Sequence, residues 1–111
     1  MDLTKFINSL PVHIQNRISI NEMHCWIFKG DPTPNGYQRC WYNGQRFMTH
    51  RLFYELFYKK DIRKWQLDHL CEVRACCNPE HMECVTPKIN INRKFRRRKT
   101  IKTIIDEPFK P

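Results

Sequence analysis

The sequence predicts a single small α+β domain of 111 residues. Short apolar and aromatic runs of strand length are separated by turn residues, a run with helical apolar spacing follows them, and six cysteines and five histidines offer metal ligands. A chain of this size builds only a small core and often needs a metal or disulfide staple. We therefore expect one zinc-stapled domain over 1–111, made of a lead-in (1–17), an antiparallel meander and helix (18–60), a metal-binding core with a basic helix (66–99) and a tail (100–111).

The chain is strongly basic. It carries 20 Lys and Arg against 11 Asp and Glu, a formal net charge of +9. Such an excess favours a polyanionic partner, with nucleic acid first and an acidic membrane surface second. No stretch is apolar enough for a signal-peptide core or a membrane span, so we expect a cytoplasmic protein without a membrane partner. In a reducing cytosol, clustered Cys and His more often hold zinc than pair as disulfides.

The N-terminal stretch is expected to be loosely packed. Apolar residues recur at helical spacing from Leu3 to Leu10, and Pro11 stops them. Ile18 and Ile20 alternate with polar neighbours, which predicts a short strand. We assign this stretch no function.

Residues 25–48 are expected to form an antiparallel meander. A strand candidate at 25–28 is followed by the turn-rich segment 30–36 and by an aromatic strand candidate at 37–42. Asn43-Gly44 is a strong two-residue hairpin turn, because both residues tolerate positive φ. The pattern therefore predicts strands joined by short turns.

A helix is predicted over 50–60, with Thr49 as its N-cap. Lys59 and Lys60 lie at its C-terminal end, where the helix dipole favours cations. Its apolar residues share one face, which predicts ordinary packing onto the core; they are Leu52, Phe53, Leu56 and Phe57.

The chemistry is concentrated between residues 66 and 90. A short strand at 67–70 leads into a loop rich in Cys and His, and a return strand follows at 82–85. Thr86 suits an N-cap and Pro87 suits the first helical position, so a helix should begin there and carry Asn90 in its first turn. The predicted order is strand, metal loop, strand, helix.

The loop contains a zinc-binding pattern. Cys71, Cys76 and His81 follow one another at two spacings of five, and Asn78-Pro79 supplies a bend that returns His81 toward the cysteines. Two thiolates and an imidazole so placed can wrap a tetrahedral zinc ion. A closed site needs a fourth ligand, and Cys25 is a distant candidate that would tie the N-terminal strand to the loop.

Alternatives to this ligand set remain open at this point. One alternative is that the cysteines are disulfide-bonded or buried thiols, although the loop is too polar for simple apolar burial. Cys40 competes with Cys25 for the fourth position. Cys77 and Cys84 compete within the loop and the return strand.

These residues resemble a known family. Leu67-Asp68-His69-Leu70-Cys71, with Cys76, Asn78-Pro79, His81-Met82 and Asn90, is similar to the motif of the HNH endonucleases, in the zinc-bearing variety common in phage genomes and related to the His-Cys box homing endonucleases. Upstream residues extend the resemblance over roughly 18–93: Cys25-Trp26, Gly36-Tyr37, His50-Arg51 and Tyr54-Glu55. The resemblance implies a ββα-metal (His-Me finger) fold and a metal-dependent cut in DNA, in the host cytoplasm if the protein is phage-encoded.

The resemblance also implies roles for single residues. Hydrolysis of a phosphodiester needs a base for water and a cation for the developing charge, and by resemblance His69 is the general base and Asn90 a metal ligand. Asp68 and Asn90 offer hard oxygen donors that suit Mg²⁺ or Mn²⁺. Asp68 serves one site with His69 only if the strand twists or ends there, and otherwise is a surface carboxylate. Arg51 is a candidate for stabilising the transition state, or a solvated helix residue.

A basic run continues the last predicted helix and is expected to contact DNA phosphates. It consists of Arg93, Lys94, Arg96, Arg97, Arg98 and Lys99. We therefore expect a metal-dependent endonuclease acting on double-stranded DNA, by nicking or by double-strand cleavage, with structural zinc. The alternatives are a non-catalytic zinc-stabilised nucleic-acid-binding module and an RNA-directed enzyme of the same fold, and the choice between monomer and homodimer stays open.

Overall fold

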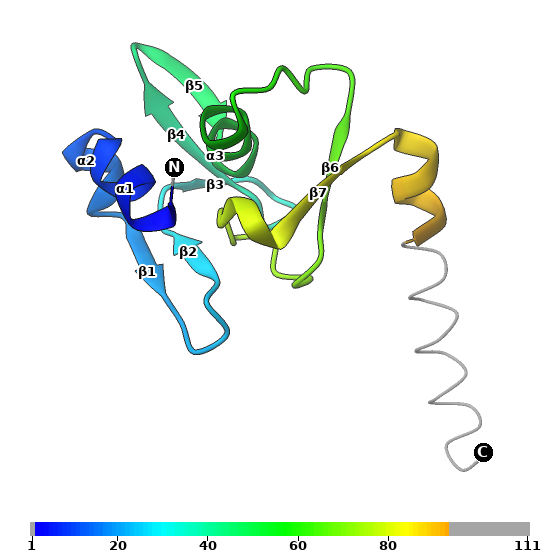
Figure 1. Ribbon diagram of the computed structural model, residues 1–111, viewed down its shortest axis with the longest axis horizontal. Helices are drawn as coiled ribbons and strands as arrows, with labels where there is room; N and C mark the ends of the chain where they lie inside the picture. The colour runs from blue at the N-terminus through cyan, green and yellow to red at the C-terminus, as the bar shows by residue number, and fades with distance from the viewer. Residues whose placement is uncertain (1, 94–111) are drawn as a thin grey trace.

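The structure is a computed structural model that describes residues 2–93. Its elements in chain order are α1 (Leu3–Ser9), α2 (Val12–Gln15), β1 (Ile18–Ile20), β2 (Trp26–Phe28), β3 (Asp31–Pro32), β4 (Gln38–Tyr42), β5 (Gln45–Met48), α3 (Thr49–Tyr58), β6 (Gln66–His69), the 3₁₀ turn η1 (Pro79–His81) and β7 (Met82–Val85). Residues 87–93 are helical. Helices and small antiparallel sheets thus alternate along the chain (Figure 1).

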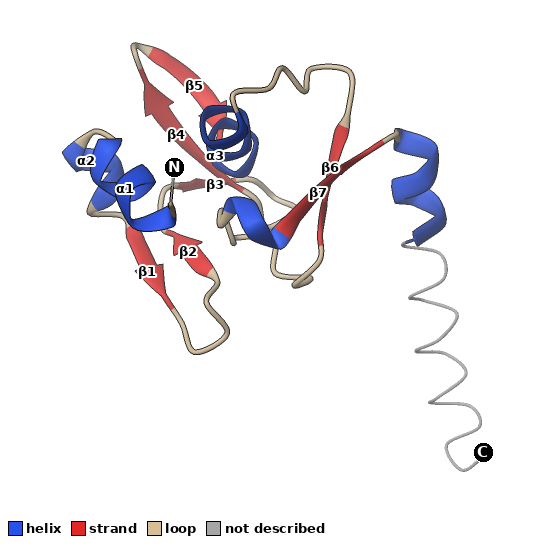
Figure 2. Ribbon diagram, viewed as in Figure 1, coloured by secondary structure: helices blue, strands red, loops and turns tan. Residues whose placement is uncertain are grey.

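Strands in the described residues form three separate antiparallel sheets, β1–β2, β3–β4–β5 and β6–β7 (Figure 2). The expected meander is correct for β3 to β5, where Asn43 and Gly44 form the turn with φ of 51° and 75°. It is wrong for the strand at 25–28. Trp26–Phe28 pairs with Ile18–Ile20, because the intervening turn at 21–25 is short enough to close a hairpin of its own.

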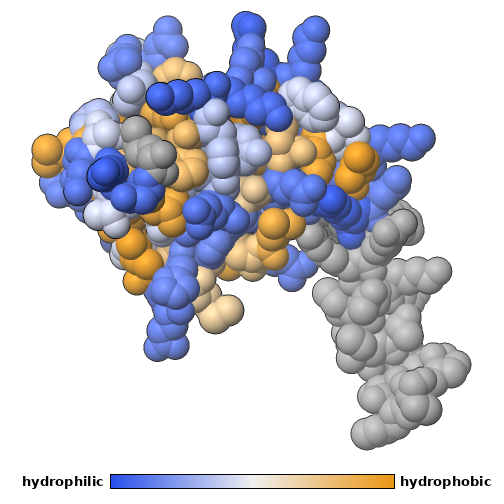
Figure 3. Space-filling model, in the orientation of Figure 1, coloured by the Kyte–Doolittle hydropathy of each residue, from blue (hydrophilic) through white to orange (hydrophobic). Residues whose placement is uncertain are grey.

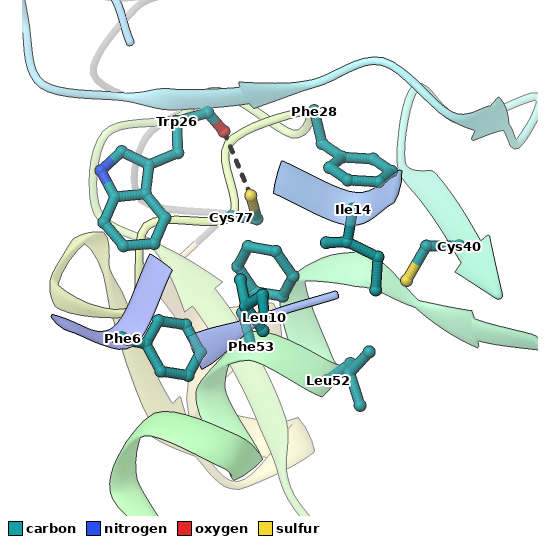
Figure 4. Packing of buried hydrophobic residues seen from close by; sticks show 9 residues of the cluster. All are labelled: Phe6, Leu10, Ile14, Trp26, Phe28, Cys40, Leu52, Phe53 and Cys77. Carbon is teal, nitrogen blue, oxygen red and sulfur yellow. Dashed lines mark hydrogen bonds between the residues drawn. The ribbon is translucent and has the colours of Figure 1, made fainter. Parts of the chain in front are cut away.

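The N-terminal stretch is packed into the larger core, contrary to the expectation of a loose lead-in. Phe6, Leu10 and Ile14 are buried. The Phe6 ring stacks on Trp26 and meets Phe53 edge-on, at centroid distances of 6.3 and 5.7 Å. Figure 4 shows these side chains converging from α1, α2, β2 and α3. A small chain gains from burying the aromatic surface that its other elements cannot cover alone.

Helix α3 begins one residue earlier than predicted. Thr49 is its first residue, Met48 occupies the N-cap position, and the Thr49 side chain makes no capping hydrogen bond. Thr49 is buried instead, which explains why it does not turn outward to cap the helix. The helix ends at Lys59, whose φ of 52° is the left-handed conformation of a helix C-terminus.

A second, smaller core supports the β6–β7 hairpin. Ile62, Leu67 and Met82 are buried there, with Tyr54 of α3 packed against them. The hairpin register pairs Gln66 with Val85. In the described part of the chain, no helix is both long and apolar enough to cross a membrane.

Candidate active site

Four potential metal ligands converge in the structure. The ligand atoms of Cys25, Cys71, Cys76 and His81 all lie within 4.8 Å of one another. Nδ1 of His81 is 3.5 Å from Sγ of Cys25 and 3.7 Å from Sγ of Cys76. These are the four residues that the sequence analysis proposes, including the distant Cys25.

The cluster has the size and chemistry of a zinc site. Zn–S and Zn–N bonds of about 2.3 and 2.1 Å in a tetrahedron require ligand atoms about 3.6 Å apart, which matches the two sulfur-to-nitrogen distances. Burial raises the pKa of the Cys25 and Cys76 thiols, to about 12 for Cys76. Thiolates in this setting need a cation beside them, and three sulfurs with one imidazole suit Zn²⁺.

Backbone pairing brings the distant ligand to the loop. Ile27 of β2 forms an antiparallel bridge with Cys76, and the Cys77 amide donates to the Trp26 carbonyl at 2.9 Å. Cys25, immediately before β2, is therefore held beside Cys76. Asn78 braces the same junction, because its Nδ2 donates to the His24 carbonyl at 2.9 Å.

The turn η1 orients His81. Asn78 Oδ1 accepts from the Glu80 amide at 3.0 Å, which caps η1, and Pro79 occupies its first turn. His81 is the last residue of that turn. This is the bend that Asn78-Pro79 predicts, and it directs the imidazole back toward the cysteines.

The remaining cysteines lie elsewhere. Cys40 and Cys77 belong to the larger core, and Cys77 Sγ donates to the Trp26 carbonyl at 3.4 Å. Cys84 packs against the smaller core. All six cysteines lie in the described residues and are free thiols, which removes the disulfide alternative from this structure.

His69 is the buried last residue of β6, 7% exposed. Its Nε2 lies 3.0 Å from the carbonyl oxygen of Cys76. A carbonyl oxygen only accepts, so Nε2 carries a proton, and in the neutral ring the basic lone pair is on Nδ1. The Cys/His loop thereby determines the tautomer of the proposed base.

His50 is a neighbour of His69 that the sequence analysis missed. The two imidazole centroids are 5.0 Å apart, and the His50 ring also stacks on Tyr37 at 5.0 Å. Burial, followed by the nearby His69 and Arg51, lowers the pKa of His50 to about 3, so the ring is neutral. Its Nδ1 is buried without a hydrogen-bond partner among the described residues. Only the packing of α3 near the end of β6 creates this pair, and no local spacing predicts it.

Asp68 and Asn90 lie on the other side of β6 from His69. Alternate residues of a strand share a face, so Gln66 and Asp68 point one way and His69 the other. Asn90 Nδ2 donates to Gln66 Oε1 at 2.7 Å, and Arg93 Nη1 donates to Asp68 Oδ2 at 3.1 Å. Helical residues 87–93 therefore cover the Asp68 face. Asn90 Oδ1 is buried and has no hydrogen-bond partner among the described residues.

Arg51 lies in a different environment from the one expected. Its Nη2 donates to the carbonyl oxygens of Ile62 and Trp65 at 2.7 and 3.0 Å. The guanidinium is thus engaged by the connection between α3 and β6. The structure places it as a brace for that connection.

The predicted DNA-contacting run is described only at its first residue. Arg93 pairs with Asp68 and with Glu83, and its side chain is 33% exposed. These carboxylates offset its charge locally. The other members of the run, Lys94, Arg96, Arg97, Arg98 and Lys99, lie outside the described residues.

The sequence model of the HNH endonucleases matches residues 47–91. This segment belongs to the HNH endonuclease family. The HNH segment includes α3, the β6–β7 hairpin, the loop ligands of the zinc cluster and Asn90. The fourth ligand, Cys25, lies outside it, so the N-terminal part of the chain completes the metal site of the HNH segment.

Two phage proteins are similar to the chain. The uncharacterized gene 5.3 protein of Enterobacteria phage T3 is 33% identical over 58 residues, which is 52% of this chain and 57% of that protein. Protein 2.8 of Escherichia phage T7 is 30% identical over 79 residues, 69% of this chain and 53% of that protein. The chain thus spans about half the length of the curated relatives it matches. No solved structure matches the chain.

Proposed function

We propose that the chain is a metal-dependent endonuclease that hydrolyses phosphodiester bonds in double-stranded DNA, with His69 as the general base. The observation that carries the proposal is the contact between His69 Nε2 and the Cys76 carbonyl, inside a segment of the HNH family. A buried imidazole held in one tautomer by a metal-stapled loop is preorganised for one proton transfer. Packing alone does not require this arrangement.

His69 would take a proton from the attacking water at Nδ1, while Nε2 remains bonded to Cys76. The resulting imidazolium is stabilised because the carbonyl continues to accept from Nε2. Neutral His50 beside it adds no opposing positive charge, since its pKa is about 3.

Asp68 and Asn90 are the proposed ligands of the catalytic cation. They lie on the face of β6 opposite to His69, but the strand ends at His69, which is the condition under which we expect the two faces to serve one site. The orphaned Oδ1 of buried Asn90 supports this role, because such an oxygen is costly unless a cation or water satisfies it. Mg²⁺ or Mn²⁺ held there would neutralise charge on the phosphate and the leaving oxygen. With β6, β7 and helical residues 87–93, these ligands form the proposed ββα-metal core.

Zinc has a structural role in this proposal. Cys25, Cys71, Cys76 and His81 offer four protein ligands, which is the closed set of a structural site. The basic run beginning at Arg93 is proposed to contact DNA phosphates, and the host cytoplasm is the proposed compartment, as the phage relatives suggest.

Digestion of supercoiled plasmid tests this function. The zinc-loaded chain should convert the plasmid to nicked or linear product when Mg²⁺ or Mn²⁺ is added, and EDTA should stop the reaction. Nicked product alone indicates cutting of one strand, and linear product at early times indicates paired cuts. Binding without cleavage at every Mg²⁺ and Mn²⁺ concentration would instead establish the non-catalytic zinc module.

A further inference from the structure

The connection between α3 and β6 is a basic turn that the proposed chemistry does not use. It spans residues 59–65 and carries four cations against one carboxylate; in order, it reads Lys59, Lys60, Asp61, Ile62, Arg63, Lys64 and Trp65. Every residue except Ile62 is exposed. We call it the 59–65 turn.

The 59–65 turn is ordered by specific contacts. Ile62 is fully buried in the smaller core and anchors its centre. Arg51 holds the carbonyls of Ile62 and Trp65, and the Trp65 amide donates to the Ile62 carbonyl at 2.9 Å. Asp61 Oδ1 accepts from the Arg63 amide at 3.0 Å. A solvated charge run needs none of these contacts, so they indicate that the backbone of the turn is ordered.

The exposed side of the turn combines positive charge with an aromatic ring. Trp65 is 42% exposed, and Lys60 Nζ lies 5.8 Å from its ring centroid. Arg63 and Lys64 join Asp61 and Trp65 around an open hollow of about 380 Å³. Asp61 pairs with Arg63 at 2.8 Å, and the three lysines of the turn leave its surface with a net positive charge. Cations that alternate with an exposed aromatic ring are typical of surfaces that contact nucleic-acid backbones.

The turn also lies next to the proposed active site. It ends at Trp65, directly before Gln66 of β6, and the Gln66 side chain contacts Asn90. His69 follows three residues later, about 10 Å along an extended strand. Successive phosphates of one DNA strand rise by about 3.4 Å, so this distance corresponds to a few nucleotides. Figure 1 shows the connection as an arch between α3 and β6, at the outer edge of the molecule.

We propose that the 59–65 turn contacts the DNA phosphate backbone a few nucleotides from the scissile bond, through Lys60, Arg63 and Lys64. The Trp65 ring lies beside the Lys60 ammonium group, and Arg51 holds the backbone of the turn through the Ile62 carbonyl. The inference rests on the proposed function and adds a second phosphate-contacting surface to the basic run that begins at Arg93. Figure 3 shows hydrophilic side chains over much of the visible face of the molecule, with hydrophobic ones between them.

Duplex binding at several salt concentrations tests the proposal in the His69→Ala variant of the 111-residue chain, without Mg²⁺, so that no cleavage intervenes. The test variant replaces Lys60, Arg63 and Lys64 with Ala. The control variant removes three exposed cations from the N-terminal part of the chain, Lys5, Arg17 and Lys29, and so has the same net charge. Zinc content and thermal unfolding midpoint are compared first to verify that both variants fold.

Three lost phosphate contacts should flatten the plot of log affinity against log salt by about 2.7, at about 0.9 per contact. The control variant should change this slope by less than about 0.9, the contribution of one contact. A charge-preserving variant, Lys60→Arg with Arg63→Lys and Lys64→Arg, should keep the wild-type slope. Equal slopes for the test and control variants, or a test slope equal to the parent's, would overturn the proposal.

The two proposals fail separately. Plasmid digestion by the otherwise unmodified chain reports cleavage, and the His69→Ala protein reports only binding. If the chain binds DNA through the 59–65 turn but never cleaves, the endonuclease proposal is rejected and the surface stands. If it cleaves while the test variant keeps its salt slope, the surface is rejected and the endonuclease stands.

Discussion

The carbonyl oxygen of Cys76 lies 3.0 Å from Nε2 of His69, so a zinc-cluster residue holds the proposed base directly. The same residue bridges to Ile27 of β2. Strand β2, the cluster and the end of β6 are therefore joined by direct contacts. An ordered Cys/His loop would therefore fix the tautomer of the proposed base, even though the four candidate metal ligands do not include His69.

His69→Ala should abolish most cleavage while leaving zinc content and DNA affinity nearly intact. The imidazole acts on water, and the loss of a general base typically costs about 10²–10⁴-fold in rate. Single-turnover cleavage of a labelled duplex measures the change. His13→Ala, at an exposed histidine of α2, is the control and should cleave at the wild-type rate. Wild-type cleavage by His69→Ala would reject the assignment of the base.

Cys76→Ser should release zinc and loosen the fold, because metal binding and folding are coupled in so small a domain. Cleavage should fall with zinc content, since a loosened loop no longer holds the carbonyl beside His69. Elemental analysis and near-ultraviolet circular dichroism measure the two effects. Cys84→Ser changes a thiol outside the cluster and should keep its zinc. A folded, metal-free Cys76→Ser protein would contradict a structural zinc.

Asn90→Ala should raise the Mg²⁺ concentration needed for half-maximal cleavage and leave zinc content unchanged. The substitution removes the orphaned Oδ1, a neutral donor to an ion that dehydrates reluctantly. Asn92→Ala, at an exposed position of the same helical segment, is the matched control. Identical Mg²⁺ titrations for the two variants would reduce Asn90 to a partner of Gln66.

The Cys/His cluster was largely predictable from the sequence because three of its candidate metal ligands are local. The spacings of Cys71, Cys76 and His81 define a loop, and the bend at Asn78-Pro79 has a local cause. Spacing alone did not separate Cys25 from Cys40 as the fourth ligand. Tertiary structure separates them, because Cys40 is buried in the larger core.

Contacts between residues of different helices and strands were less predictable from the sequence. The sequence analysis places the strand at 25–28 in the meander, but it pairs with β1 through a short turn with weak sequence signals. His50 and Arg51 are adjacent in sequence, yet one contacts His69 and the other the 59–65 turn. A residue's neighbours across elements follow from packing, which periodicity along one helix does not encode.

His50 should make the free energy of unfolding depend on pH between about 3 and 6.5. The pKa of its folded form is lowered to about 3, chiefly by burial, from an ordinary value of 6.5. Below pH 6.5 the unfolded chain takes up a proton that the folded chain refuses, so stability falls as the pH falls, and above pH 6.5 this contribution is constant. Between pH 7 and 5 the loss is about 2 kcal/mol.

Urea unfolding of wild type and His50→Phe at pH 5, 6 and 7 isolates this contribution. Phenylalanine keeps a ring against Tyr37 but does not titrate. Zinc ligands titrate in both proteins, so their effect cancels in the difference between the two pH dependences. Parallel pH dependences would show that His50 titrates normally in the folded protein.

Arg51→Ala should lower the stability of the fold and weaken DNA binding, with little effect on the rate of the chemical step. Its guanidinium donates to the carbonyls of Ile62 and Trp65, and a hydrogen bond to a charged group contributes about 1.5–3 kcal/mol. Arg17→Ala, which removes one exposed contact to the Lys29 carbonyl at 3.2 Å, should cost less than about 1 kcal/mol. Chemical unfolding compares the two variants.

Kinetics then separate a brace from a catalytic arginine. As a brace, Arg51→Ala weakens duplex affinity because the 59–65 turn loosens, while the rate at saturating DNA stays within a few-fold of wild type. A guanidinium that stabilises the transition-state charge would instead cost about 10²–10³-fold in that rate, with affinity and stability little changed. The second pattern would support the transition-state role, one of the two that the sequence analysis allows for Arg51, and it would require Arg51 to leave both carbonyls when DNA binds.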